Sequence, residues 1–248
     1  PEFLKTPVII PPLSSLDCSL AIVAASGKII PTEIINLFPR GILNIHPSLL
    51  PKYRGPSPLQ YALLNGETET GVTIIKIDEQ VDHGSVLTSS KYSITGFELY
   101  EDLESKLAKL GAELLIKTLP DYLAGNLEVK PQDDLRATFT KMISKADGKI
   151  DWHRNAQQIY NQFRAFHQWP GIYTVWQEKT LKIIDCQPLE VKPQDSHTGQ
   201  LYQENGHLFI PCQPGQLELL KVQFAGGKVM TAREFINGYG KSINSEYN

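Results

Sequence analysis

The chain has little of what marks secreted, metal-binding or membrane proteins. Its 248 residues include only three cysteines, Cys18, Cys186 and Cys212, without the short spacings of a disulfide framework or a zinc site. No apolar run reaches the roughly 18 residues that a membrane span needs. The first residues also lack the basic start and long apolar stretch of a secretory signal. We therefore expect a cytoplasmic protein with reduced thiols, no metal and no membrane partner.

A basic excess is also missing. Lys and Arg number 24 against 27 Asp and Glu; residues 1–147 carry 14 against 18, and residues 148–248 carry 10 against 9. A strongly basic domain is the usual mark of nucleic-acid binding, so charge alone does not predict an RNA-binding protein. The basic residues of the second half either gather in one patch or are scattered over the surface. The residues of such a patch would be Arg164, Lys182, Lys221, Lys228 and Arg233.

Short apolar runs predict an α/β fold in the first domain, residues 1–125. Continuous apolar runs of this length are typical of strands that are covered on both faces. Helical patterns lie between the runs, and this alternation predicts a mainly parallel, Rossmann-like sheet. The expected strands are residues 7–11, 19–26, 41–45 and 72–77. Pro58 begins a short helix that ends before Gly66, and a long amphipathic helix is predicted from Leu99, Leu103, Leu107, Leu110 and Leu114.

The pattern changes after the first domain. Residues 126–147 are polar and predict a linker. In residues 148–248, one helix at residues 156–166 precedes a series of short β segments. The expected strands are residues 172–176, 181–185, 200–202, 208–211 and 217–224. This arrangement fits a small barrel of the oligonucleotide-binding (OB) type.

Two local signals support this reading of the second domain. Asn205-Gly206 is the preferred pair for a tight β-hairpin turn. Thr231 and Glu234 have the spacing of a capping box, which predicts a last short helix.

Three polar residues follow or end predicted strands of the first domain. Asn44 and His46 are two positions apart in an extended segment, so their side chains project to the same face. Asp82 comes shortly after the next strand. Open α/β enzymes keep their chemistry at such strand ends, and we therefore expect a catalytic site there.

These residue types suit attack on an acyl carbon. Asn44 can donate a hydrogen bond to the oxyanion that forms, and His46 can do so when it is protonated or held in the right tautomer. Asp82 can orient His46, accept a proton directly, or accept it through water. No Ser or Cys nucleophile is required. The attacking group would then belong to a substrate, which indicates transfer between two bound molecules.

The stretch from Asn44 to Leu87 closely resembles the catalytic segment of the 10-formyltetrahydrofolate-dependent formyltransferases, with Asn, His and a later Asp at the family's spacing. The sequence of this stretch and of segments downstream is most similar to the branch that formylates methionyl-tRNA. This resemblance covers about residues 8–239. The segments that carry this likeness are Tyr53-Arg54-Gly55-Pro-Ser-Pro58, Lys149-Ile-Asp151-Trp152, Trp169-Pro170-Gly171 and Phe224-Ala-Gly226-Gly227-Lys228.

The resemblance implies a donor, an acceptor and a set of roles. Formyl would move from 10-formyltetrahydrofolate to methionyl initiator tRNA, in a protein that is a monomer in its full-length form. Asn44 and His46 would stabilise the tetrahedral intermediate, and Asp82 would assist proton transfer. The basic residues of the second domain would contact tRNA. The implied folate-binding residues are Ser26, Gly27, Ile29, Ile30, Ser48, Leu49, Leu50, Pro51, Gln80, Val81 and Gly84.

Two neighbouring residues have simpler interpretations. Arg54, as a loop arginine, predicts a structural ion pair or carbonyl clamp. His83 predicts a solvent-facing turn residue.

Other functions stay open at this point. The chain could formylate an amino-sugar nucleotide, or be the hydrolase domain of a folate dehydrogenase.

In the family, further strands and helices precede the segment that matches residues 7–11. We therefore expect an incomplete sheet, with residues 19–26 unpaired on one side or paired abnormally with residues 7–11. The third alternative is a catalytically silent RNA-binding fragment.

Overall fold

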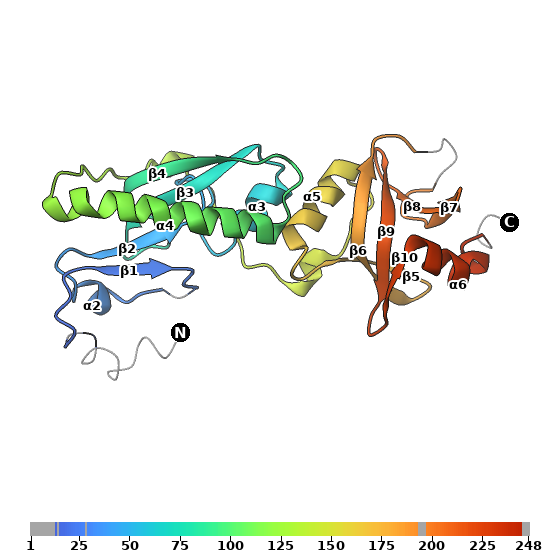
Figure 1. Cartoon of the computed structure of the whole chain (residues 1–248), viewed down its shortest axis with the longest axis horizontal. Coiled ribbons are helices and arrows are strands. Elements are labelled where there is room, and N and C mark those ends of the chain that lie inside the picture. The colour runs from blue at the N-terminus through green and yellow to red at the C-terminus, as the bar shows by residue number, and fades with distance from the viewer. Residues whose placement is uncertain (1–12, 14, 28, 193–196, 245–248) are drawn as a thin grey trace. The chain divides into compact units, whose positions relative to one another are not determined.

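The computed structural model describes residues 13, 15–27, 29–192 and 197–244, so the strand expected at residues 7–11 lies outside the described part. The chain divides into two compact units (Figure 1). The first comprises the described residues of Pro1–Ala62 and Glu67–Met142, and the second those of Leu63–Gly66 and Ile143–Asn248. Among the described residues, no helix is both long enough and apolar enough to cross a membrane.

The first unit contains a four-stranded mixed sheet in the order β1-β2-β3-β4. Its strands are β1 (Ala21–Ala24), β2 (Ile42–His46), β3 (Glu69–Lys76) and β4 (Ser85–Ser93). β1 and β2 are parallel, whereas β2–β3 and β3–β4 are antiparallel. The α/β class is confirmed, but the expectation of a mainly parallel sheet is wrong for the described strands.

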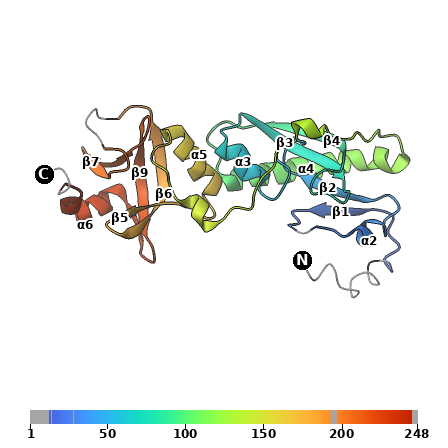
Figure 2. The same ribbon diagram turned by 180° about the vertical axis from the view of Figure 1, so that it is seen from behind.

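β4 explains much of this difference, because the sequence did not predict it. From Thr88 on its residues alternate between partly buried and exposed, and the strand includes four serines, which hides it in a search for apolar runs. β3 and β4 form a hairpin whose connecting loop carries Asp82 (Figure 2). Asp82 therefore lies on a hairpin loop, whereas Asn44 and His46 lie on β2, which is parallel to β1.

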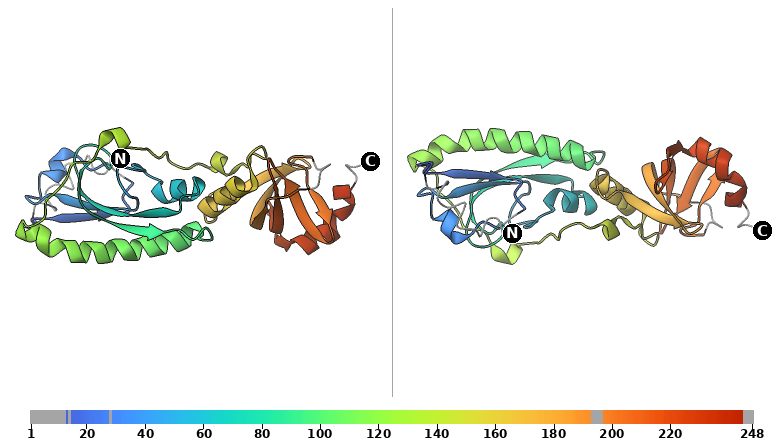
Figure 3. Two further views of the ribbon diagram at one scale, coloured as in Figure 1. Left: turned by 90° about the horizontal axis from the view of Figure 1, so that it is seen from above. Right: turned by 90° about the horizontal axis from the view of Figure 1, so that it is seen from below.

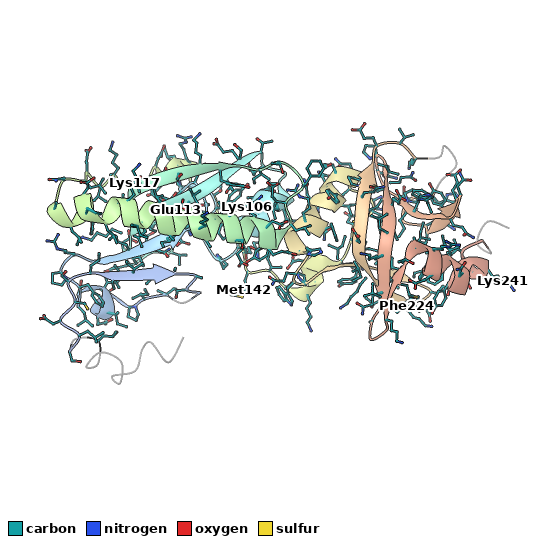
Figure 4. The ribbon with its side chains drawn as sticks, in the orientation of Figure 1. Lys106, Glu113, Lys117, Met142, Phe224 and Lys241 are labelled. Carbon is teal, nitrogen blue, oxygen red and sulfur yellow. The ribbon has the colours of Figure 1, made fainter. Side chains whose placement is uncertain are left out.

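Helices cover both faces of this sheet. Helix α4 (Tyr100–Ala124) runs along one face (Figure 3), where its apolar stripe packs against Leu43 and Ile74. The stripe passes through Leu103, Leu107 and Leu115, and Leu110 and Leu114 lie at its border. The charged residues Lys106, Glu113 and Lys117 project from the exposed side of α4 (Figure 4).

Gly111 allows α4 to lie close to the strands. A Cβ atom at this position would lie 2.6 Å from Ile45 Cγ2 and 3.3 Å from Val72 Cγ1. On the other face, Ile34 and Phe38, on and after the short helix α2 (Thr32–Ile35), pack on Ile42. Neighbouring β2 residues therefore face different layers, and Asn44 and His46 share the face of Ile42.

β1 is an edge strand of the described sheet. Its described backbone pairs with β2 alone, and Ile22 is 47% exposed. Residues 7–11, the alternative partner expected for residues 19–26, lie outside the described part, so that expectation stays a prediction.

The second unit contains a six-stranded antiparallel sheet in the order β5-β6-β9-β8-β7, with β10 paired to β9. The unit begins with α5 (Ala156–Phe166) and ends with α6 (Ala232–Asn244). The strands are β5 (Ile172–Trp176), β6 (Lys179–Leu189), β7 (Tyr202–Glu204), β8 (His207–Pro211), β9 (Gln216–Phe224) and β10 (Val229–Thr231). An antiparallel β domain is confirmed, although the strand expected at residues 200–202 overlaps β7 only at Tyr202.

The local signals of the second unit are also confirmed. Asn205 and Gly206 have φ angles of 52° and 82° and join β7 to β8. The Thr231 N–H and hydroxyl both donate to Glu234 at 2.8 Å and so cap α6. The core beneath α6 is aromatic: the Phe235 ring lies 5.3 Å from Trp176 and 5.8 Å from Phe224, which Figure 4 labels.

The expected linker at residues 126–147 is tied to the first unit as far as Met142. Lys130 and Val86 exchange two backbone hydrogen bonds, of 2.7 and 2.9 Å. Arg54 N–H donates to Thr138 O at 2.9 Å, and Thr140 N–H donates to Arg54 O at 2.8 Å. Two 3-10 turns, Asp134–Arg136 and Lys145–Gly148, interrupt the segment.

Candidate active site

The three residues predicted for catalysis lie together, because the carboxylate of one of them, Asp82, contacts the other two. Asp82 Oδ1 accepts a hydrogen bond from Asn44 Nδ2 at 3.2 Å and lies 3.4 Å from His46 Nδ1. Its second oxygen, Oδ2, accepts from the Gly55 backbone N–H at 2.8 Å. The side chains of His46 and Asp82 are only 4% and 15% exposed. The distance between His46 and Asp82 is within the range expected for a direct or one-water contact.

The backbone explains why these groups meet. Asn44 and His46 lie on the same face of β2, and the β3–β4 loop brings Asp82 back over that face. Asp82 has a φ of 50°, a left-handed conformation that costs roughly 1 kcal/mol for a residue with a side chain. This unusual backbone turns its carboxylate toward β2.

The surroundings of His46 define which atoms carry hydrogens. Its Nε2 lies 2.9 Å from the Tyr53 carbonyl oxygen, which can only accept, so Nε2 carries a hydrogen. The contact between Nδ1 and the Asp82 carboxylate is favourable when Nδ1 carries a proton as well. Both ring nitrogens of His46 therefore already contact groups of the protein. Asn44, which lines the cavity, can offer a side-chain hydrogen bond there.

Asp82 is tuned to stay ionised. Burial by itself raises its pKa, but the hydrogen bond and charge of His46, the Gly55 N–H and the Arg54 charge outweigh burial. Together they hold the pKa of Asp82 below its ordinary value of 3.8. A buried carboxylate that remains charged near neutral pH can accept a proton from a substrate.

Asn44 and Asp82 lie on the wall of a cavity of about 250 Å³ within the first unit. Several residues expected to bind folate line the same cavity, namely Ser26, Gly27, Ile29, Ile30, Gln80 and Val81. Apolar residues and two glycines make up most of this wall. Such a wall suits a flat ring with polar edges.

Five residues of the expected folate site lie elsewhere. Leu49, Leu50 and Pro51 line a separate hollow together with Lys52 and Thr138. Ser48 is fully buried, and its hydroxyl donates to Lys52 O at 2.5 Å. Gly84 is absent from both walls; a Cβ there would lie 1.9 Å from the Lys76 carbonyl oxygen, so this glycine permits the hairpin to close.

Other lining residues were missed by sequence reasoning. They are Val23, Gly55, Pro56, Ile75, Ile77, Asp78 and Met142. Period-two alternation from Asn44 and along β3 could have identified Ile75, because alternate strand residues share a face. Met142, labelled in Figure 4, is far from the other lining residues in sequence and carried no signal.

Arg54 forms the structural ion pair that its position predicts. It is 4% exposed, and its Nη2 lies 2.7 Å from Asp134 Oδ1. His83 lies in a turn, as predicted, and its side chain is 30% exposed, but it is also held by two carboxylates, with Nδ1 2.5 Å from Asp78 and Nε2 3.4 Å from Asp134. The hydrogen bond to Asp78, and then the charges of both carboxylates, raise the pKa of His83 despite some burial.

The basic residues of the second unit differ in accessibility. Arg164 is 2% exposed and donates to Asn161 Oδ1 at 3.1 Å, so its expected contact with tRNA phosphate does not fit this structure. The other four are exposed: Lys182, Lys221, Lys228 and Arg233. Lys182 pairs with Gln223, two residues from Lys221 on β9, so both lysines point from one face of the sheet.

Within the described part of the chain, no group of three or more His, Cys, Asp or Glu side chains is placed to hold a metal ion. The described thiols are not paired either. Burial raises the pKa of Cys212 to about 11 and that of Cys186 further, whereas Cys18 is exposed.

Comparison with known proteins identifies the class. The formyl transferase family model matches residues 5–119, and the formyl transferase C-terminal domain model matches residues 142–240. The two matches together cover most of the sequence. The chain belongs to the formyl transferase family, whose members are one-carbon transferases.

Individual relatives show which branch of the family the chain is most similar to. The methionyl-tRNA formyltransferase of Thermodesulfovibrio yellowstonii is 40% identical over 238 residues, covering 96% of this chain and 76% of the relative. That of Listeria monocytogenes is 39% identical over 245 residues, covering 98% and 78%. The chain thus falls in the methionyl-tRNA formyltransferase branch of the family.

Solved structures agree on the fold. HypX from Aquifex aeolicus in complex with tetrahydrofolic acid has a TM-score of 0.69 at 17% identity and covers 97% of this chain and 42% of its own. An N-formyltransferase from Helicobacter canadensis, in complex with folinic acid and dTDP-3-aminofucose, has a TM-score of 0.63 at 21% identity, with coverages of 77% and 70%. At these identities the likeness concerns the fold alone.

Proposed function

We propose that the chain transfers a formyl group from 10-formyltetrahydrofolate to the α-amino group of methionyl initiator tRNA. The observation that carries this proposal is the shared contact of Asp82 Oδ1 with Asn44 Nδ2 and His46 Nδ1, at 3.2 and 3.4 Å, on the wall of a largely apolar cavity. Membership of the methionyl-tRNA formyltransferase branch supports the choice of donor and acceptor.

The reaction needs one bond formed, one broken and one proton moved. The acceptor nitrogen bonds to the formyl carbon, and a tetrahedral oxyanion forms. The bond from that carbon to the folate nitrogen then breaks, and the proton lost by the amine ends on that nitrogen. Asn44 and His46 stabilise the oxyanion, and Asp82 collects and passes on the proton.

His46 has two ways to contribute. It donates directly to the oxyanion if its bond to the Tyr53 carbonyl opens when substrates bind. With that bond kept, it holds a proton beside Asp82 and acts as a positioning residue.

The cavity beside Asn44 is the proposed folate site. Its wall includes residues 26, 27, 29, 30 and 79–82, whose polar groups can match the donors and acceptors at the edge of a pterin ring. Residues 48–51 belong to our proposal only through the family resemblance, since they line a separate hollow.

The second unit is the proposed tRNA-binding part, through the exposed Lys182, Lys221, Lys228 and Arg233. We keep residues 1–125 as the catalytic domain, 126–147 as the connecting segment and 148–248 as the OB-like domain. A cytoplasmic monomer is the proposed working form.

A comparison of acceptors tests this proposal. The purified protein receives 10-formyltetrahydrofolate and either methionyl initiator tRNA or an amino-sugar nucleotide, and formylated product is measured by mass. We expect formyl-methionyl-tRNA and no formylated sugar. Product from the sugar alone would favour the amino-sugar reading, and tRNA binding without any product would favour a silent RNA-binding fragment.

A further inference from the structure

A side chain of the connecting segment, Gln132, forms hydrogen bonds to the backbone of the loop that carries Asp82. The Gln132 amide donates both of its hydrogens to the β3–β4 loop: Nε2 lies 2.9 Å from the Asp82 carbonyl oxygen and 2.8 Å from that of Gly84. The two carbonyls lie on either side of His83, near the end of the loop, and one of them belongs to Asp82, the residue with the left-handed backbone.

Arg54 fixes the orientation of that amide. Gln132 Oε1 accepts from Arg54 Nε at 3.0 Å. A guanidinium can only donate and a backbone carbonyl can only accept, so the amide has one orientation that satisfies all three partners. Because Arg54 is 4% exposed and also bonded to Asp134, this arrangement has little freedom to move.

The backbone of the connecting segment holds Gln132 in turn. Lys130 pairs with Val86 just beyond the loop, and Thr138 and Thr140 pair with Arg54. Arg54 is next to Gly55, whose N–H donates to Asp82 Oδ2. Both the backbone and the carboxylate of Asp82 are therefore positioned by one continuous network that starts at residues 130–140.

We propose that Gln132 is a positioning residue of the reaction, which fixes the β3–β4 loop so that the Asp82 carboxylate meets Asn44 and His46. This inference rests on the proposed function. It assigns a catalytic purpose to a segment that the sequence presents as a linker. Loss of the two bonds lets the strained Asp82 backbone relax, and a displacement of about 1 Å can cost on the order of 100-fold in rate.

The test substitutes Gln132→Met, which keeps length and removes all three hydrogen bonds. The matched control is Glu128→Gln, four residues earlier in the same segment, whose side chain is 83% exposed and lies 3.7 Å from Lys130 Nζ. We expect Gln132→Met to lower kcat by roughly 10- to 100-fold, with the KM of the donor and of the acceptor within about threefold of the parent. The control should retain the kcat of the parent.

A double-mutant cycle separates positioning from a general loss of structure. In an Asp82→Asn background, where the carboxylate no longer works, Gln132→Met should change kcat by less than about twofold. Equal costs of Gln132→Met in both backgrounds would overturn the inference, because the residue would then act independently of Asp82.

A second readout does not depend on activity. The imidazole nitrogens of His46, observed by ¹⁵N NMR at pH 7, report the carboxylate 3.4 Å away. We expect Gln132→Met to change their chemical shifts and Glu128→Gln to leave them unchanged. If the parent forms no formyl-methionyl-tRNA while this change appears, the proposed function fails and the positioning role of Gln132 for Asp82 survives. If the parent is active and neither kcat nor the chemical shifts respond, the inference fails alone.

Discussion

At the scale of single residues, the site depends on how one carboxylate is shared. Asp82 contacts a carboxamide, an imidazole and a backbone N–H, and these contacts keep its pKa low despite burial. A lone buried carboxylate would behave in the opposite way, because burial raises its pKa. The site therefore contains a carboxylate that is charged at neutral pH, with two side-chain hydrogen-bond donors beside it.

Substitution of Asp82 tests that role. Asp82→Asn keeps the shape but removes the charge and the proton acceptor, so we expect kcat to fall by roughly 100- to 10,000-fold. The pH profile of kcat should also change. Kinetics between pH 5 and 9 provide the measurement, with the exposed Glu33→Gln as the control. An unchanged profile with full activity would make Asp82 a structural residue.

Glu98 provides a separate prediction about stability. It is 4% exposed and accepts from the Thr95 N–H and hydroxyl, at 3.0 and 2.8 Å. Burial raises its pKa, but the Thr95 hydroxyl, the backbone N–H groups and Lys106 together lower it from 4.5 to about 2. Because the folded-state pKa is depressed, the stabilisation is fully present above pH 4.5 and is lost as the pH falls toward 2.

We therefore expect Glu98→Gln to reduce the free energy of unfolding by about 1.5–3 kcal/mol at pH 7. The difference from the parent should shrink when both are unfolded in urea at pH 3. A difference that stays constant between pH 7 and pH 3 would contradict the ionised role of Glu98.

The sequence could reveal the residues of the site but not all of their partners. Asn44 and His46 follow from the alternation of side chains in a strand, and Asp82 from its place after the next strand. Gln132 bonds to Asp82 from a distant polar segment with no periodicity, so only the folded chain identifies it. Arg164 shows the reverse error, since its charge suggested a surface that burial excludes.

At the scale of secondary structure, the loop of the β3–β4 hairpin carries Asp82, the proposed proton acceptor. This loop has room only for a glycine at position 84, because a Cβ would lie 1.9 Å from the Lys76 carbonyl oxygen. We expect Gly84→Ala to destabilise the protein by about 1–3 kcal/mol, as overpacking does, and to reduce formyl transfer.

Gly238→Ala is the matched control for this substitution. Gly238 lies in α6 with nothing within 4 Å of a built Cβ, so alanine there should stabilise the helix by about 0.8–1 kcal/mol. Thermal and urea unfolding of both variants provide the comparison. Equal stabilities for Gly84→Ala and the parent would mean that the hairpin closes without a glycine.

Apolar runs predicted the buried strands β2 and β3, because those strands are covered by helices on at least one face. β4 escaped prediction because its polar positions point outward, and the same omission led to the expectation of a parallel sheet. Capping and turn residues predicted the structure of the second unit more reliably, because their effect depends only on neighbours in sequence. Examples are Thr231 with Glu234, and Asn205 with Gly206.

At the scale of the whole molecule, the proposed reaction needs a donor site and an RNA surface. Lys182 and Lys221 share one face of the second sheet, and Lys228 lies in the turn between β9 and β10. Changing all three to Ala should weaken tRNA binding and reduce its salt slope by about 1 for each lost phosphate contact. The affinity for folate should stay unchanged.

The control triple variant changes Lys91, Lys109 and Lys117 to Ala, which removes the same charge from exposed positions of the first unit. Binding of initiator tRNA is measured for both variants at several salt concentrations. Equal slopes for the two variants would mean that the lysines of the second unit are ordinary surface charges.

The most direct test of the proposed function compares formyl transfer by the parent and by Asn44→Ala at saturating donor and acceptor, with the Kd of the folate donor measured in parallel. Asn44 is a side-chain hydrogen-bond donor on the cavity wall beside Asp82, so its loss should lower kcat by roughly 100- to 1,000-fold and change the Kd by less than about tenfold. Turnover within about threefold of the parent would contradict the account, because the oxyanion would then be stabilised elsewhere.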